Sequence, residues 1–176
     1  MAFADPTENL KNLNIKEGSR VADFGSGSGF YSFGLARRVG DSGRVYAIDV
    51  QKDLLTKLKN RAKEDRLDNL EVIWADLDVL GGTKLADSSL DAVVISNILF
   101  QAESRGNLTL EAKRILKNGG EALVIDWADS YGGLGPHPDQ IFKASQAEDL
   151  FTKNGFALIK SFDAGEHHWG LLFRKL

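Results

Sequence analysis

The sequence contains no cysteine among its 176 residues. This absence excludes disulfides, thiolate zinc sites, iron–sulfur clusters and cysteine nucleophiles. No apolar run reaches the ~18 residues that a membrane-spanning helix needs. Basic residues are not in excess, with 22 Lys and Arg against 25 Asp and Glu and a net charge of −3, so nucleic acid is not a favoured partner. The polar, acidic start, Met1–Asn9, is unlike a signal peptide, and we expect a cytoplasmic protein without a membrane span.

What is present is an ordinary globular composition, with 43% apolar and 27% charged residues. The length predicts a single domain over residues 1–176, of which residues 1–19 form a short N-terminal helical extension. Asp5 can cap this helix, and Pro6 suits its first position. We expect the helix to end near Asn14.

Short apolar segments alternate with helical patterns along the chain, an arrangement typical of a parallel α/β sheet. Strands are expected at Arg20–Phe24, Arg44–Asp49, Leu70–Trp74, Leu90–Ser96, Glu121–Trp127, Phe156–Phe162 and His168–Lys175. Helices are expected at about Tyr31–Val39, Asp53–Arg66, Ser104–Lys117 and Gln140–Asn154. The last two strands are joined by a connection too short for a parallel crossover. The prediction is a Rossmann-like, doubly wound α/β sheet of seven strands, five of them parallel and two in a C-terminal antiparallel hairpin, with helices on both faces.

A glycine-rich turn at residues 25–29 follows the first expected strand, where glycines let a ligand approach the backbone. Its spacing is G-x-G-x-G, and Phe30 stands where a dinucleotide-binding turn needs glycine. Asp23, inside the strand before the turn, would repel a pyrophosphate and attract an amino group. These features disfavour a nicotinamide-dependent oxidoreductase.

Two further acids follow expected strands. Asp49 ends the second strand, where an acid can accept hydrogen bonds from ribose hydroxyls. Asp76 follows the third strand and can accept from an adenine amine, although Asp78 could fill that role instead. An amine-facing, a ribose-facing and an adenine-facing acid together describe an amino-acid nucleoside, and S-adenosylmethionine is such a molecule.

These residues resemble the class I S-adenosylmethionine-dependent methyltransferases, in particular small-molecule enzymes similar to the quinone-biosynthesis C-methyltransferases. The resemblance rests on the turn at residues 21–29, the acid after Tyr46-Ala47-Ile48, Ala75-Asp76, the strand Leu90–Val93 with Ser96-Asn97, and the turn at residues 114–120. It implies S-adenosylmethionine as cofactor and no metal. The implied cofactor contacts are Asp23, Gly25, Ser26, Gly27, Gly29, Tyr31, Asp49, Val50, Asp76, Leu77 and Asn97.

Acceptor-side residues are harder to identify. Asp126 ends the fifth strand and His137 lies in the loop after it, so these two are the candidate catalytic residues. His167 and His168 open the last strand, and alternation should turn one of them inward. As a metal site, the three histidines are a weak candidate.

The methyl acceptor itself is not identified by the sequence, and a small molecule is the leading expectation. The segment Ser96-Asn97-Ile98-Leu99 has no proline, unlike enzymes that methylate base amino groups. The short N-terminal extension suggests an open site, a large acceptor or a completing partner. An RNA or protein methyltransferase, or a cofactor-binding subunit beside a catalytic partner, are the alternatives, and an exposed apolar patch near Phe3, Leu10 or Phe100 would favour the subunit. Monomer and homodimer both stay open.

Overall fold

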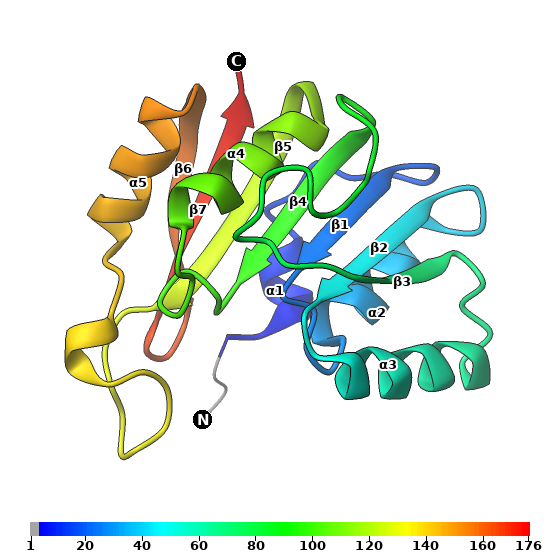
Figure 1. The fold of residues 1–176 in the computed structure, drawn as a ribbon, viewed down its shortest axis with the longest axis horizontal. Coiled ribbons are helices and arrows are strands. Elements are labelled where there is room, and N and C mark those ends of the chain that lie inside the picture. Colours follow the sequence, from blue (N-terminus) through cyan, green and yellow to red (C-terminus); the bar gives the residue numbers. More distant parts are fainter. Residues whose placement is uncertain (1–3) are drawn as a thin grey trace.

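The computed structural model describes residues 4–176 and contains one seven-stranded sheet (Figure 1). The strand order is β3-β2-β1-β4-β5-β7-β6. The strands are β1 (Arg20–Phe24), β2 (Arg44–Asp49), β3 (Leu70–Trp74), β4 (Leu90–Ser96), β5 (Leu116–Trp127), β6 (Phe156–Gly165) and β7 (His168–Lys175). β1 to β5 are mutually parallel, and β7 pairs antiparallel with both β5 and β6. The predicted five parallel strands and antiparallel hairpin are confirmed.

Helices cover both faces of this sheet, as predicted. They are α1 (Pro6–Leu10), α2 (Phe30–Val39), α3 (Lys52–Glu64), α4 (Arg105–Ile115) and α5 (Ala144–Lys153), with a short 3-10 turn η1 (Pro138–Gln140). Along β1, Val21 packs into a core cluster with α1 and α2, whereas Ala22 and Phe24 pack into the cluster that contains α4 and α5. The two-residue period of the strand therefore builds one core on each face.

Several predicted boundaries differ from the structure, and three of them have a consequence for the packing. The first helix ends at Leu10 rather than near Asn14, although the apolar side chains that follow it, Leu13 and Ile15, remain buried. The expected helix 140–154 begins only at Ala144, because Phe142 packs against the core and its carbonyl accepts the Trp169 Nε1–H at 3.1 Å. β5 starts at residue 116, where it pairs with β4 across an irregularity in the register.

The strand order reverses between β1 and β4, and the carboxyl ends of β1, β2, β4 and β5 open onto the same edge of the sheet (Figure 1). Loops that leave neighbouring strands in opposite directions at such a point leave a crevice, and ligands of open α/β sheets bind there. Within residues 4–176, every helix is too short or too polar to cross a membrane.

Candidate active site

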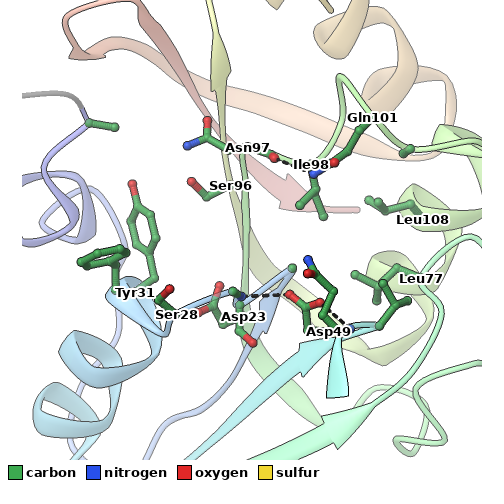
Figure 2. A pocket seen from close by; sticks show the side chains of 18 of the residues that line it. Asp23, Ser28, Tyr31, Asp49, Leu77, Ser96, Asn97, Ile98, Gln101 and Leu108 are labelled. Carbon is green, nitrogen blue, oxygen red and sulfur yellow. Dashed lines mark hydrogen bonds between the residues drawn. The ribbon is translucent and has the colours of Figure 1, made fainter. Parts of the chain in front are cut away.

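A cavity of about 1060 Å³ lies at this carboxyl edge (Figure 2). Its volume lies slightly above the roughly 300–1,000 Å³ usual for small-molecule sites. Ten of the eleven predicted cofactor contacts line it: Asp23, Gly25, Ser26, Gly27, Tyr31, Asp49, Val50, Asp76, Leu77 and Asn97. The structure thus brings together residues from the carboxyl ends of β1, β2 and β4 and from the loop after β3.

The glycine turn shapes the floor of the cavity. Gly25 has a φ of +70°, and a Cβ there would lie 2.2 Å from Cγ2 of Ile98, which comes from the loop after β4. Gly27 also has a positive φ, but a Cβ there would meet only the Gly25 carbonyl at 3.9 Å. Gly25 therefore permits the close approach of the neighbouring loop, whereas the space above Gly27 stays open to a ligand.

Gly29 is the predicted contact that does not line the cavity. It precedes α2 with a φ of +85°, and a Cβ there would lie 2.8 Å from Phe33 and 2.9 Å from Leu58. Its backbone conformation and this close contact between α2 and α3 both favour glycine. A spacing pattern cannot distinguish such a packing glycine from one that faces a ligand.

Asp49 joins the ends of β1 and β2 through its carboxylate. Oδ2 accepts the Gly27 N–H at 2.9 Å, and Oδ1 accepts the Gln51 N–H at 2.9 Å. These bonds hold both oxygens in a defined orientation at the cavity, as the dashed lines in Figure 2 show. Each oxygen keeps a second lone pair, so the group can accept hydrogen bonds from two neighbouring hydroxyls.

Asp23 supplies a buried carboxyl group to the same cavity. Its side chain is only 2% exposed, and the Ser32 hydroxyl donates to Oδ2 at 2.5 Å. Burial raises the pKa of Asp23 to about 6, against the opposing effect of the Ser32 hydrogen bonds and with a smaller contribution from Asp49. A desolvated carboxylate gains free energy from a cationic partner, so the site suits a ligand with an ammonium group.

The loop after β3 brings two acids to the cavity, and their hydrogen bonds differ. Asp78 accepts the backbone N–H groups of Glu103 at 3.1 Å and Ser104 at 2.9 Å, one on each carboxylate oxygen, and so fixes the segment before α4. Among residues 4–176, the Asp76 carboxylate accepts only the Asp78 N–H, at 2.9 Å through Oδ1. Asp76 consequently has more acceptor capacity left for a ligand than Asp78.

Two buried side-chain oxygens that belong to cavity residues have no hydrogen-bond partner among residues 4–176: Ser26 Oγ and Asn97 Oδ1. Asn97 also adopts a φ of +56°, which is uncommon for a residue other than glycine. Buried polar atoms normally have partners, and backbone strain of this kind collects at functional sites. Together with the open space above Gly27, these orphaned oxygens fit a polar ligand in the cavity.

The two candidate catalytic residues do not line the cavity. Asp126 is fully buried, and its carboxylate accepts the N–H groups of Leu99 at 2.8 Å and Phe100 at 3.3 Å, so it holds the loop after β4 in place. Burial raises the pKa of Asp126 to about 6 despite these bonds. His137 is exposed and hydrogen-bonded to Asp139 two residues away.

Trp127 and His168 line the cavity instead, as does Tyr31. The Trp127 and His168 ring centroids are 4.3 Å apart, and His168 Nδ1 bonds the Glu166 carbonyl at 2.9 Å. Burial lowers the pKa of His168, which keeps the ring neutral at pH 7. His168 faces inward, as the alternation of the strand allowed for one of the two histidines, whereas His167 bonds Asp129 at 2.5 Å.

Sequence reasoning missed several lining residues. The described N-terminal segment contributes Ala4, Asp5 and Pro6, and the loop after β4 contributes Ile98, Gln101, Ala102 and Glu103. The proximity of the N-terminal segment to the cavity depends on long-range packing: the Asn9 amide donates to the Tyr31 hydroxyl at 3.1 Å and to the Ala164 carbonyl at 3.0 Å. No local signal in the sequence reports such contacts, but the Ile98–Glu103 segment directly follows Asn97 and could have been included on that ground.

Comparisons with known proteins agree with this architecture. A family model described as a methyltransferase domain matches residues 15–169. An arsenite methyltransferase of Halobacterium salinarum is 27% identical over 70% of this chain, and a ubiquinone/menaquinone biosynthesis C-methyltransferase of Chromobacterium violaceum is 29% identical over 74% of it. The aligned parts are 30% and 52% of those two proteins, so the chain spans at most about half of their lengths.

A solved structure extends the likeness to nearly the whole chain. The crystal structure of a SAM-dependent methyltransferase from Aquifex aeolicus superposes with a TM-score of 0.88 and 26% identity, covering 98% of this chain and 90% of that one. The glycine turn, the acids at the strand ends and the antiparallel hairpin thus occur within a shared fold. The chain belongs to the methyltransferase domain family, and its fold is that of the class I S-adenosylmethionine-dependent methyltransferases.

Proposed function

We propose that this chain is an enzyme that transfers the methyl group of S-adenosylmethionine to a small molecule. The observation that carries the proposal is the convergence of three differently placed acids on one cavity: the buried Asp23, the doubly anchored Asp49 and the loop residue Asp76. An ammonium group, a pair of ribose hydroxyls and an adenine amine would satisfy these acids in turn. The bound cofactor supplies a methyl group already activated by a positively charged sulfur.

The other predicted contacts have compatible positions. Tyr31 and Asn97 would lie near the methionine part and the sulfonium, and Gly25, Ser26 and Gly27 would let the ligand approach the backbone. Val50 and Leu77 line the cavity beside Asp49 and Asp76, where apolar side chains would contact the faces of the adenine. The protein's contribution to such an in-line displacement is mainly alignment of the acceptor with the methyl group.

The acceptor would be small rather than an RNA. Among the described residues that line the cavity there is no Lys or Arg, and phosphate recognition normally depends on such groups. Of the three apolar residues whose exposure would favour a dependent subunit, Leu10 is 3% exposed and Phe100 is half-buried, while Phe3 lies outside the described residues. These observations favour an enzyme with its own acceptor site.

Thermal unfolding with and without S-adenosylhomocysteine tests the cofactor half of the proposal, with NAD as the control ligand. At 100-fold over Kd, a ligand that binds only the folded state adds about 2.7 kcal/mol, which corresponds to roughly 5–10 °C for a domain of this size. We expect that shift with S-adenosylhomocysteine and none with NAD. We also expect the shift to be lost in Asp49→Ala and kept in Asp149→Ala, an exposed position on α5.

A stabilisation by NAD alone, or no response to either ligand, would contradict the proposal. Since Asp49 also anchors the glycine turn, the more conservative Asp49→Asn variant serves as a second test. It keeps an oxygen for the Gly27 N–H, but its NH₂ group replaces the oxygen that accepts the Gln51 N–H, so it loses that bond and has fewer acceptors for hydroxyls. An unfolding temperature near that of the natural chain, with a weakened ligand response, would separate lost binding from lost folding.

A further inference from the structure

Every charged side chain described along the cavity is acidic. The acids are Asp5, Asp23, Asp49, Asp76, Asp78 and Glu103. Within the described part of the lining no Lys or Arg accompanies them, and the burial-lowered pKa of His168 leaves its ring uncharged. The described side chains therefore give the cavity a field of one sign before the cofactor binds.

Five of the six carboxylates already accept hydrogen bonds from the chain itself. Asp23, Asp49, Asp76 and Asp78 do so as described above, and Asp5 accepts the Thr7 N–H at 2.8 Å as the cap of α1. Glu103 differs: its side chain is exposed and has no hydrogen bond or ion pair among residues 4–176. Because its backbone N–H is held by Asp78, the residue is fixed at the cavity while its carboxylate remains available.

Aromatic side chains also line the cavity. Trp127 and Tyr31 line it from β5 and α2. Aromatic faces attract cations through the ring quadrupole, by about 0.5–2 kcal/mol depending on exposure. Negative carboxylates and aromatic faces favour the same kind of ligand, a positively charged group on an apolar body.

We infer that the methyl acceptor is an amine on an aromatic or apolar small molecule, and that Glu103 attracts its ammonium form at the cavity mouth. The inference rests on the proposed methyl transfer and adds the acceptor class to it. An anionic acceptor such as a carboxylate or phenolate would find only the cofactor's sulfonium as a countercharge, because no Lys or Arg belongs to the described lining of the cavity.

The charge balance of the transfer agrees with an amine. The ammonium first loses its proton to water, and the neutral nitrogen then attacks the methyl carbon with its lone pair. The carbon–sulfur bond breaks with its electron pair going to sulfur, so that the positive charge passes from sulfur to nitrogen. Cationic charge is present before and after the step, surrounded by the same carboxylates, and no oxidant or reductant is required.

The test compares three probes of one shape and different charge: 2-phenylethylamine, 2-phenylethanol and 3-phenylpropionate. Binding of each probe to the protein saturated with S-adenosylhomocysteine is measured by calorimetry, up to 10 mM. Transfer from methyl-labelled S-adenosylmethionine, itself a cation, is followed by chromatographic separation of the labelled product from the unreacted cofactor, and mass spectrometry identifies the methylated probe. We expect the amine to bind at least tenfold more tightly than the carboxylate, and the labelled product to be a cation.

Glu103→Gln should weaken amine binding about twofold to fivefold, the range for an exposed ion pair. Its matched control is Glu148→Gln, an exposed glutamate on α5 outside the cavity, which should change nothing. Equal or tighter binding of the carboxylate, methylation of the alcohol but not the amine, or no binding of any probe would overturn the inference. If S-adenosylhomocysteine itself fails to stabilise the chain, the proposed function fails; if it stabilises and the amine preference is absent, only the acceptor inference fails.

Discussion

Replacing the buried Asp23 by Asn should stabilise the ligand-free protein while it removes cofactor binding. The unfolded chain has an ordinary Asp pKa of 3.8, whereas burial raises the pKa of the folded-state group to about 6. Between these two values the native state holds more protons than the unfolded state, so the free energy of unfolding falls as the pH rises. Above about pH 6 the full cost is present, and it amounts to about 3 kcal/mol.

Asn removes the charge and most of this cost. Its amide oxygen can still accept from the Ser32 hydroxyl, but its NH₂ group requires a new acceptor in a site that is 2% exposed. We therefore expect a net gain of about 1–2 kcal/mol at pH 8, or roughly 3–6 °C in Tm. At pH 5 the gain should shrink, because Asp23 is then largely protonated in the natural protein.

The assay is urea unfolding at pH 5 and pH 8, with and without S-adenosylhomocysteine. Asp149→Asn, on the exposed face of α5, is the control for a simple change in net charge. The ligand should stabilise the natural protein and the control, but not Asp23→Asn. The reasoning would be refuted by a variant that is more than 1 kcal/mol less stable at pH 8, by a stability difference independent of pH, or by an unchanged ligand response.

Three further predictions follow from named contacts. Gly25→Ala should lower the free energy of unfolding by about 2–4 kcal/mol, because the alanine would adopt a positive φ and its Cβ would overlap Ile98. In a double-mutant cycle, the double variant with Ile98→Ala should recover at least ~1 kcal/mol of this loss. Strictly additive effects of the two substitutions would contradict the contact. Glu111→Gln should lower the free energy of unfolding by about 3 kcal/mol at pH 7, since the Arg114 and Thr83 hydrogen bonds outweigh burial and lower the pKa of Glu111 from 4.5 to about 2. This stabilisation is present above pH 4.5 and is lost as the pH falls towards 2. Urea unfolding should therefore show a smaller difference between the natural protein and the variant at pH 4 than at pH 7. His137→Ala should leave ligand-induced stabilisation unchanged, because the exposed ring lies outside the cavity lining, and a shift reduced by half would show that the loop closes over the site.

Parts of the site were predictable because they are local in the chain. The glycine turn follows its strand immediately, and Asp49 ends its strand within the same stretch of sequence. Parallel strands place their carboxyl ends at one edge of the sheet, so acids at these ends must come near one another once the strand pattern is recognised. For this reason ten of the predicted contacts line one cavity.

Asp126, at the end of β5, is a residue whose position relative to the cavity could not be predicted from the strand pattern. Its place at the end of β5 suggested a catalytic role, but its carboxylate is directed to the N–H groups of the loop after β4. Trp127, one residue further on, lines the cavity instead. The two-residue period of a strand predicts that neighbours face opposite ways, but only the packing of the loops decides which of the two faces the site.

The sequence alone therefore determined the order of the strands along the chain, the glycine turn and the acids at the strand ends, since each depends on neighbours a few residues apart. The tertiary structure decided which groups share the cavity: that Glu103 and the N-terminal Asp5 join it, that Gly29 packs between helices, and that Asp126 supports a loop. These facts depend on contacts between residues far apart in the chain. Such contacts arise from packing, and packing is settled by the shapes of all the elements together.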